Sequence, residues 1–156
     1  MNESLIEPHP TNRIVVGVDG SYYSKFALKW AAYLAKLSGA GIDAMLVWQS
    51  PLLHSREWTT SLPRDQMRAD MEKGLTEAVD DVFGENRPAE LRLLVQEGST
   101  PTVLIDRSKV ATLLVVGSRG HGGFANLLLG SVSTKCVQHA HCPVLVIHGN
   151  EPPALP

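Results

Sequence analysis

Short apolar runs alternate with segments of helical periodicity along this chain, and this alternation restricts its fold more than any other feature. Five predicted strands lie at 13–18, 42–48, 90–98, 112–117 and 143–148, and helix signals occupy the intervals between them. The run at 42–48 is apolar on both faces, as in a strand buried inside a sheet. Strands that alternate with helices pair in parallel. The sequence therefore predicts a single-domain α/β fold: a doubly wound five-stranded parallel sheet, order 3-2-1-4-5, with helices on both faces.

The first predicted helix carries signals at both ends. Ser21 is a residue type that caps helix N-termini, and Gly39 is typical of the position just past a C-terminus. Large apolar side chains recur between them at helical spacing, which predicts a buried face. The members of this face are Phe26, Trp30, Leu34 and Leu37.

Size and charge narrow the class of protein. The 156 residues fit one domain, which we expect to span 13–148 between loose tails at 1–12 and 149–156. A hydrophobic fraction of 44% is typical of a soluble globular chain. No apolar run approaches the ~18 residues of a membrane span, and the N-terminus lacks a signal-peptide core, so we expect a cytoplasmic protein without a membrane partner. A net charge of −2, with scattered basic residues, disfavours nucleic acid as a partner.

Cysteines and histidines near the C-terminus raise the question of a metal site. Cys136 and Cys142 bracket His139 and His141. Their spacing matches no common zinc pattern, and Cys142 opens an apolar strand, where a thiol often serves as a small hydrophobe. We therefore expect no metal at these residues.

The loops after the first and fourth strands are expected to form one binding site. Ligands of open parallel sheets bind beyond the carboxyl ends of the strands where the winding reverses, and the order 3-2-1-4-5 places that reversal between these two strands. The loops read GVDGS at 17–21 and VVGSRGHGGFANLLLGS at 115–131. Glycines at 117, 120 and 130 allow close backbone approach, while Ser131, as the cap of the next helix, and Ser133 offer hydroxyls and N–H groups to an anion. Asp19 is expected on the ribose side of a bound nucleotide.

Two familiar phosphate-binding loops do not fit this chain. The sequence contains no G-K-[ST], which excludes the P-loop. Residues 120–125, GHGGFA, satisfy the dinucleotide pattern G-x-G-x-x-A, but they follow the fourth strand instead of the first. No Asp or Glu lies near position 145 to hold a ribose diol. A redox dinucleotide domain is therefore a poor interpretation.

The spacing G-x2-G-x9-G-S, met by Gly117, Gly120, Gly130 and Ser131, resembles the ATP-binding motif of the universal stress protein family. RIVVGVDGS at 13–21 is similar to the opening strand and turn of the family, and CPVLVIH at 142–148 to its closing strand. The resemblance covers nearly the whole chain. It implies a Rossmann-like, adenine nucleotide alpha-hydrolase-like fold that binds ATP with Mg²⁺, with AMP and cyclic AMP as further candidate ligands.

The resemblance also implies roles for individual residues. Those beside the base and ribose are Gly17, Val18, Asp19, Val47, Val116 and Gly117, with Asp19 near the ribose hydroxyls and Val47 along the adenine. Those that hold phosphates are Gly120, Gly130, Ser131, Val132 and Ser133. Arg119 and His121 are further candidates, because a cation inside the motif would meet phosphate oxygens. Members of the family commonly pair their last strands, which implies a homodimer through Pro143 to His148.

These expectations together describe an ATP-binding regulatory protein of the stress response, with no residue assigned to catalysis. Three alternatives stay open at this level: a slow ATP hydrolase that relies on Asp19, a cyclic AMP-binding protein, and a protein interaction module without nucleotide. The aperiodic segment 49–63 is a candidate lid over the ligand.

Overall fold

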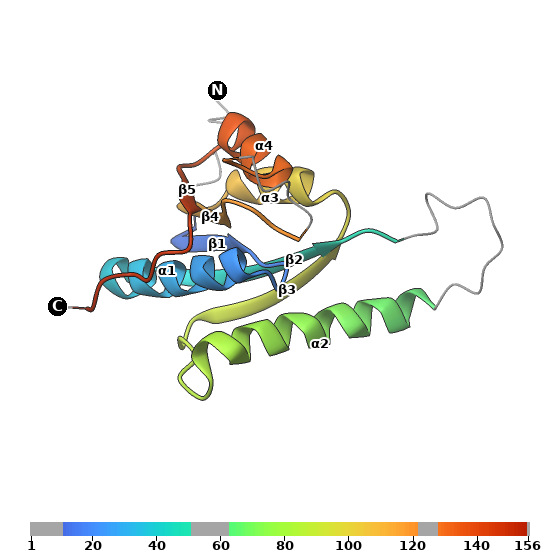
Figure 1. Cartoon of the computed structure of the whole chain (residues 1–156), viewed down its shortest axis with the longest axis horizontal. Helices are drawn as coiled ribbons and strands as arrows, with labels where there is room; N and C mark the ends of the chain where they lie inside the picture. Colours follow the sequence, from blue (N-terminus) through green and yellow to red (C-terminus); the bar gives the residue numbers. More distant parts are fainter. Residues whose placement is uncertain (1–10, 51–62, 122–127, 156) are drawn as a thin grey trace, which may run out of the picture.

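Five parallel strands form one sheet at the centre of the structure (Figure 1). The computed structural model describes residues 11–50, 63–121 and 128–155. The strands are β1 (Arg13–Gly17), β2 (Gly41–Trp48), β3 (Leu91–Glu97), β4 (Leu113–Gly117) and β5 (Val144–Ile147). Their order in the sheet is β3-β2-β1-β4-β5, and every neighbouring pair is parallel. This confirms the predicted α/β fold and its strand order.

Helices pack on both faces of the sheet (Figure 1). One face is covered by α1 (Tyr22–Ser38) and α2 (Arg64–Phe83), and the other by α3 (Thr100–Ser108) and α4 (Ser131–His139). Because side chains alternate along a strand, Val16 of β1 belongs to the core with α1, whereas Val15 packs with Leu104 of α3. The sheet thus separates two hydrophobic cores.

Helix α1 carries mostly small residues on its buried face. As predicted, Ser21 caps the helix by accepting a hydrogen bond from the Ser24 N–H, and Gly39 ends it with a φ of 71°. The buried residues are Ser24, Ala27, Leu28, Ala31 and Ala35. Of the predicted apolar face, Phe26, Trp30 and Leu34 are partly buried and pack against the same core, whereas Leu37 is 52% exposed and departs from the prediction. Small side chains let the helix backbone approach the sheet, so the larger ones pack beside that contact.

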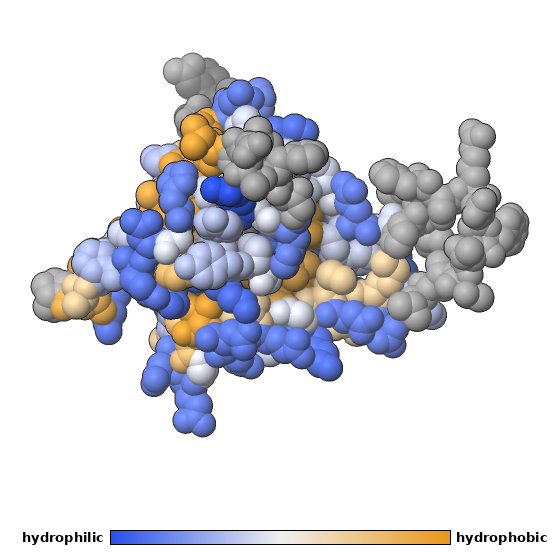
Figure 2. Space-filling view, in the orientation of Figure 1, coloured by the Kyte–Doolittle hydropathy of each residue, from blue (hydrophilic) through white to orange (hydrophobic). Residues whose placement is uncertain are grey.

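Helix α2 presents a long hydrophilic surface, which gathers along the lower part of the molecule in Figure 2. Of its 20 residues, Leu75, Ala78 and Val79 are buried. No helix within the described ranges is both long and apolar enough to cross a membrane.

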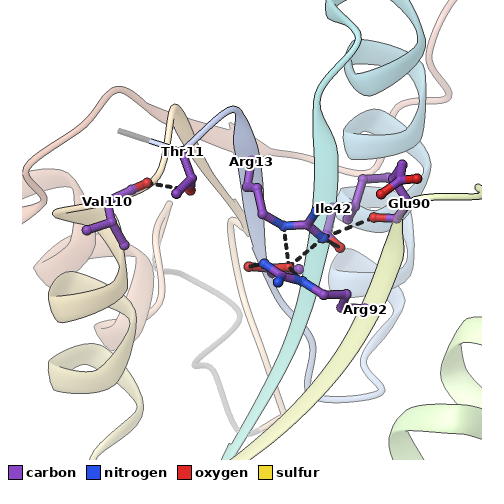
Figure 3. Close-up of polar contacts among 7 residues, drawn as sticks. Thr11, Arg13, Ile42, Glu90, Arg92 and Val110 are labelled. Carbon is purple, nitrogen blue, oxygen red and sulfur yellow. Dashed lines mark hydrogen bonds and ion pairs between the residues drawn. The ribbon is translucent and has the colours of Figure 1, made fainter. Parts of the chain in front are cut away.

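A cluster of two arginines and an aspartate joins β1, β2 and β3 near their amino ends (Figure 3). Arg13 donates to Asp43 Oδ1 at 2.7 Å and to the carbonyl oxygens of Ile42 and Glu90 at 2.8 and 3.0 Å. Arg92 holds both carboxylate oxygens of Asp43, at 2.8 and 3.0 Å. Burial raises the pKa of Asp43, but the hydrogen bonds and charges of Arg92 and Arg13 outweigh burial, so its pKa lies below the usual value. The cluster ties three strands together at the end of the sheet opposite the predicted binding loops.

Both described ends of the chain contact the domain. Thr11 donates through its N–H and its hydroxyl to the Val110 carbonyl, each at 2.8 Å. After β5 the chain runs along α1 (Figure 1), where Trp30 Nε1 donates to the Asn150 carbonyl at 2.7 Å and Lys29 pairs with Glu151 at 2.6 Å. Residues 1–10, and all but three residues of the candidate lid 49–63, lie outside the described residues.

Candidate functional site

A cavity of about 420 Å³ lies at the carboxyl ends of β1, β2 and β4. This volume is within the range of small-molecule and cofactor sites. Every residue that the sequence singled out for binding lines it: Gly17, Val18, Asp19, Val47, Val116, Gly117, Arg119, Gly120, His121, Gly130, Ser131, Val132 and Ser133. The sheet order brings the two predicted loops to one place, as the switch-point argument requires.

The turn from β1 into α1 fixes Asp19 at the cavity. Its Oδ1 accepts a hydrogen bond from the Ser21 N–H at 2.9 Å, and its own N–H donates to the Ser24 hydroxyl at 3.3 Å. Gly20 follows with a φ of 79°, a conformation that glycine adopts without steric cost. The second carboxylate oxygen, Oδ2, points toward Gly120, since a Cβ built there would lie 2.5 Å from it. The carboxylate of one loop therefore lies directly beside the backbone of the other.

Hydrogen bonds join the beginning and the end of the glycine-rich loop. The Gly130 N–H donates to the Ser118 carbonyl at 2.6 Å, and the Ser133 hydroxyl lies 3.1 Å from the same oxygen. Ser133 is buried, and its hydroxyl also lies 3.0 Å from the Gly130 carbonyl. Residues 122–127, between these two ends, lie outside the described part of the loop. The Ser133 hydroxyl thus has partners within the protein that close the loop onto α4.

The N-terminus of α4 faces the cavity, but its cap differs from the prediction. Gly130, in an extended conformation with φ −71° and ψ 171°, is the N-cap, and Ser131 is already the first helical residue. The prediction of Ser131 as the cap is therefore wrong, because the backbone turns into the helix one residue earlier. The first bond of the helix runs from the Thr134 N–H to the Gly130 carbonyl at 3.0 Å. The N–H groups of residues 131–133 precede that bond and lie at the positive end of the helix, where anions are stabilised.

The three motif glycines have different reasons to lack a side chain. A Cβ built at Gly117 would lie 2.7 Å from Tyr23 Cβ and 2.9 Å from the Tyr23 carbonyl carbon, so α1 requires a glycine there. At Gly120 the obstacle is the Asp19 carboxylate. At Gly130 the nearest atom would be Arg119 Cα at 3.5 Å, an ordinary contact. The described part of the protein therefore leaves room for a methyl group at position 130. Contacts within the protein do not explain why this position is a glycine.

The end of the cavity nearest β2 and α3 is mostly apolar. Met45 and Val47 lie two residues apart on β2, so their side chains project from the same face of the strand. Leu104 of α3 reaches across to β1, where a Cβ at Gly17 would lie 3.1 Å from Leu104 Cδ1. With Val116 these side chains form a surface suited to a flat apolar group, such as a nucleobase.

Four residues of the cavity were missed by the sequence reasoning: Ser24, Met45, Thr100 and Leu104. The two-residue period of a strand relates Met45 to Val47, and that signal was available. Thr100 and Leu104 are one helical turn apart on α3, but only the sheet order shows that the start of α3 lies beside β2.

The side chains of Arg119 and His121 border the cavity. The Arg119 guanidinium carbon lies 5.6 Å from the centre of the Tyr23 ring, within the range of a cation–π contact. His121 Nε2 would lie 3.7 Å from a Cβ built at Gly20. Asp19 is the one acidic side chain among the described lining residues. Electrostatically the site therefore combines one carboxylate with a guanidinium and a helix N-terminus.

The cysteines lie apart from this cavity. Burial raises the pKa of the Cys136 thiol to about 11. It also raises the pKa of Cys142, against an opposing hydrogen bond with the Leu114 backbone. Metal ligation requires a thiolate, which such shifts disfavour. Across the described ranges, no three or more His, Cys, Asp or Glu side chains are grouped so that they could hold a metal ion.

Comparison with known proteins agrees with the fold. The model of the universal stress protein family matches residues 10–148. A universal stress protein of Mycolicibacterium smegmatis is 34% identical over 145 residues, which are 88% of this chain and 48% of that protein. The chain thus spans about half the length of the curated relatives it matches.

Two universal stress proteins solved with nucleotides have a similar fold. One, from Archaeoglobus fulgidus in complex with dAMP, is 25% identical with a TM-score of 0.58, over 92% of this chain and 100% of that one. The other, in complex with cAMP, is 23% identical with a TM-score of 0.56, over 88% and 97% of the two chains. Together with the match of the family model over most of the sequence, these findings show that the chain belongs to the universal stress protein family.

Proposed function

We propose that this chain binds ATP with Mg²⁺ in the cavity between β1 and β4, and acts in the cytoplasm as a nucleotide-dependent regulator in stress response. The observation that carries the proposal is a single cavity with an apolar end at β2 and α3 and a helix N-terminus at its other end. A nucleotide has the same polarity, because its base is flat and largely apolar and its phosphates are anionic. The complexes of two family members with dAMP and cAMP support an adenine nucleotide as the ligand.

The placement of the nucleotide follows from the chemistry of each end. The base lies against Met45, Val47 and Leu104, and the ribose lies beside Asp19, whose carboxylate accepts hydrogen bonds from hydroxyl groups. The phosphates lie at Gly120, Gly130 and the N–H groups of residues 131–133. Arg119 and His121, at the same end, add cationic or hydrogen-bonding groups for phosphate oxygens.

Magnesium would be held mainly by the phosphates themselves. Mg²⁺ prefers oxygen ligands, keeps several waters and commonly combines one or two carboxylates with substrate phosphates. Asp19 can supply one carboxylate oxygen, and no other acidic side chain lines the described cavity. The ion would therefore be recruited with ATP.

Isothermal titration with ATP and Mg²⁺ tests the proposal. We expect saturable heat at micromolar ATP with one site per chain. The absence of heat at high micromolar ATP would overturn the proposal and leave the interaction module without nucleotide as the better interpretation.

Cyclic AMP is the second candidate ligand, because one structural neighbour is in complex with it. The two ligands differ at the phosphate end: ATP can fill the whole α4 N-terminus, whereas cyclic AMP places one phosphate there. Competition of ATP and cyclic AMP for the purified protein distinguishes them. Tighter binding of cyclic AMP would replace ATP in the proposal.

A further inference from the structure

Thr100 supplies the one polar side chain that α3 and β2 contribute to the described cavity. The other side chains that these two elements contribute, those of Met45, Val47 and Leu104, are apolar. No hydrogen bond occupies the Thr100 hydroxyl within the described part of the chain, in contrast to Ser24, whose hydroxyl donates to the Ser21 carbonyl at 3.0 Å. An apolar surface with one available hydroxyl can orient a base as well as bury it.

The turn before α3 fixes the position of this hydroxyl. The Gly98 N–H donates to the Trp48 carbonyl at 2.8 Å, which attaches the turn to the end of β2. Gly98 has a φ of 150°, and a Cβ there would lie 3.1 Å from Val103 Cγ2, so the turn depends on glycine. Val103 then donates to the Ser99 carbonyl at 2.9 Å and begins the helix with Thr100 as its first residue. Thr100 is therefore held in place by backbone contacts on both sides.

The geometry points to a specificity-determining role: we propose that the Thr100 hydroxyl accepts a hydrogen bond from the exocyclic amino group of adenine. This rests on the proposed nucleotide site. With the phosphates at α4, the ribose beside Asp19 and the base directed toward β2, the amino group lies on the part of the purine farthest from the ribose. That part reaches the α3 side of the cavity, where Thr100 lies.

The Thr100 hydroxyl would make binding selective for the group that the base carries at this position. A hydroxyl both accepts and donates, so it favours bases with a polar group at this position over bases with only hydrogen there. Thr100 should therefore distinguish adenine from unsubstituted purine. One net hydrogen bond of this kind corresponds to roughly a three- to tenfold difference in affinity.

The test compares ATP with purine riboside triphosphate, which lacks only the amino group, by isothermal titration. We expect the wild-type protein to bind ATP roughly three- to tenfold more tightly than purine riboside triphosphate. Thr100→Val should reduce this ratio of affinities to about one, because it weakens the binding of ATP alone. Thr100→Ser retains the hydroxyl and should retain the ratio. Thr102→Val makes the same chemical change at an exposed position of α3 and should alter neither affinity.

The outcomes separate this inference from the function on which it rests. Equal weakening of both ligands in Thr100→Val, or an unchanged ratio, overturns the role of Thr100 while nucleotide binding stands. Failure of the wild-type protein to bind either triphosphate overturns both. Thermal unfolding of each variant verifies its fold, and the Ser variant tests the hydroxyl even where Val disturbs α3.

Discussion

A methyl group at position 130 would approach no described protein atom closer than 3.5 Å, and Gly130 has an ordinary extended conformation. The protein fold alone should therefore tolerate Gly130→Ala. The proposed phosphates lie against the same backbone, where an added methyl group would displace them. We expect Gly130→Ala to weaken ATP binding at least about tenfold, which corresponds to ~1.4 kcal/mol, and to lower the free energy of unfolding by under about 1 kcal/mol, because alanine is a poorer N-cap than glycine. Titration calorimetry and thermal unfolding measure the two effects.

Gly74 offers a matched control for this substitution. It lies on the exposed side of α2, away from the cavity, and a Cβ there meets nothing within 4 Å. Gly74→Ala should leave ATP affinity unchanged and raise the free energy of unfolding by roughly 0.5–1 kcal/mol, because alanine favours the helix. If Gly130→Ala bound ATP as tightly as the wild type, the phosphates would have to lie elsewhere.

Asp43 is the residue whose charge contributes most clearly to stability. Its carboxylate is 11% exposed and accepts hydrogen bonds from Arg13 and Arg92. At pH 7 we expect Asp43→Asn to lower the free energy of unfolding by roughly 1.5–3 kcal/mol, the range for hydrogen bonds to charged groups. The exposed pair of Asp106 with Lys109 is the control, and Asp106→Asn should cost under about 1 kcal/mol.

The pH dependence of Asp43 follows from the direction of its pKa shift. Its folded pKa lies below the unfolded value of 3.8, so the unfolded chain binds the proton more readily. The stabilisation is complete well above pH 3.8 and is lost as the pH falls through the lower, folded value. Denaturant unfolding measures the free energy of unfolding of the wild type and of Asp43→Asn. The difference between these two free energies should be constant near neutrality and shrink below pH 3.8. A difference that grew on acidification would contradict this account.

At the scale of elements, two serines on the first turn of α4 have separate tasks. The Ser133 hydroxyl is buried against the Ser118 and Gly130 carbonyls, whereas Ser131 is exposed at the cavity. Ser133→Ala should lower the free energy of unfolding by roughly 0.5–1.5 kcal/mol, because the loop loses a hydrogen bond to the helix. Ser131→Ala should change stability by less than about 0.5 kcal/mol and affect ATP affinity instead. Denaturant unfolding measures the stability of each variant, and titration calorimetry measures its ATP affinity. A loss of stability in Ser131→Ala and a loss of affinity alone in Ser133→Ala would reverse the two roles.

Periodicity and turn residues were sufficient to predict the strands, and the doubly wound topology of alternating strands and helices supplied their order and the position of the cavity. The parts that sequence reasoning missed depend on distances between elements. The sequence reasoning missed the fully buried part of the α1 face, because Ala27 and Ala31 are small side chains with weak periodic signals. The cap of α4 was wrong because Ser131 and Gly130 are both acceptable caps, and the backbone path decides between them. The contacts of Asp43 join positions 30 and 49 residues apart, which no local pattern reveals.

At the scale of the whole molecule, β5 leaves one edge of the sheet open in the described structure. Pro143 and Ile147 accept hydrogen bonds from β4, through the Leu114 and Ser118 N–H groups at 3.0 and 2.8 Å. In a parallel ladder the bonding residues of a strand alternate with residues whose N–H and C=O face away. Val144 and Val146 therefore direct their backbone groups toward the open edge. An unpaired edge of this kind can pair with a second chain.

The proposed homodimer through Pro143 to His148 depends on those outward groups. Val146→Pro removes an N–H that faces away from β4, a position where proline is tolerated in an edge strand. Val146→Ala trims the same side chain but keeps the N–H. We expect sedimentation to show a dimer for the wild type and the Ala variant, and a monomer that still binds ATP for the Pro variant. A Pro variant that stays dimeric would place the interface elsewhere, and a wild type that is monomeric at high concentration would contradict the homodimer.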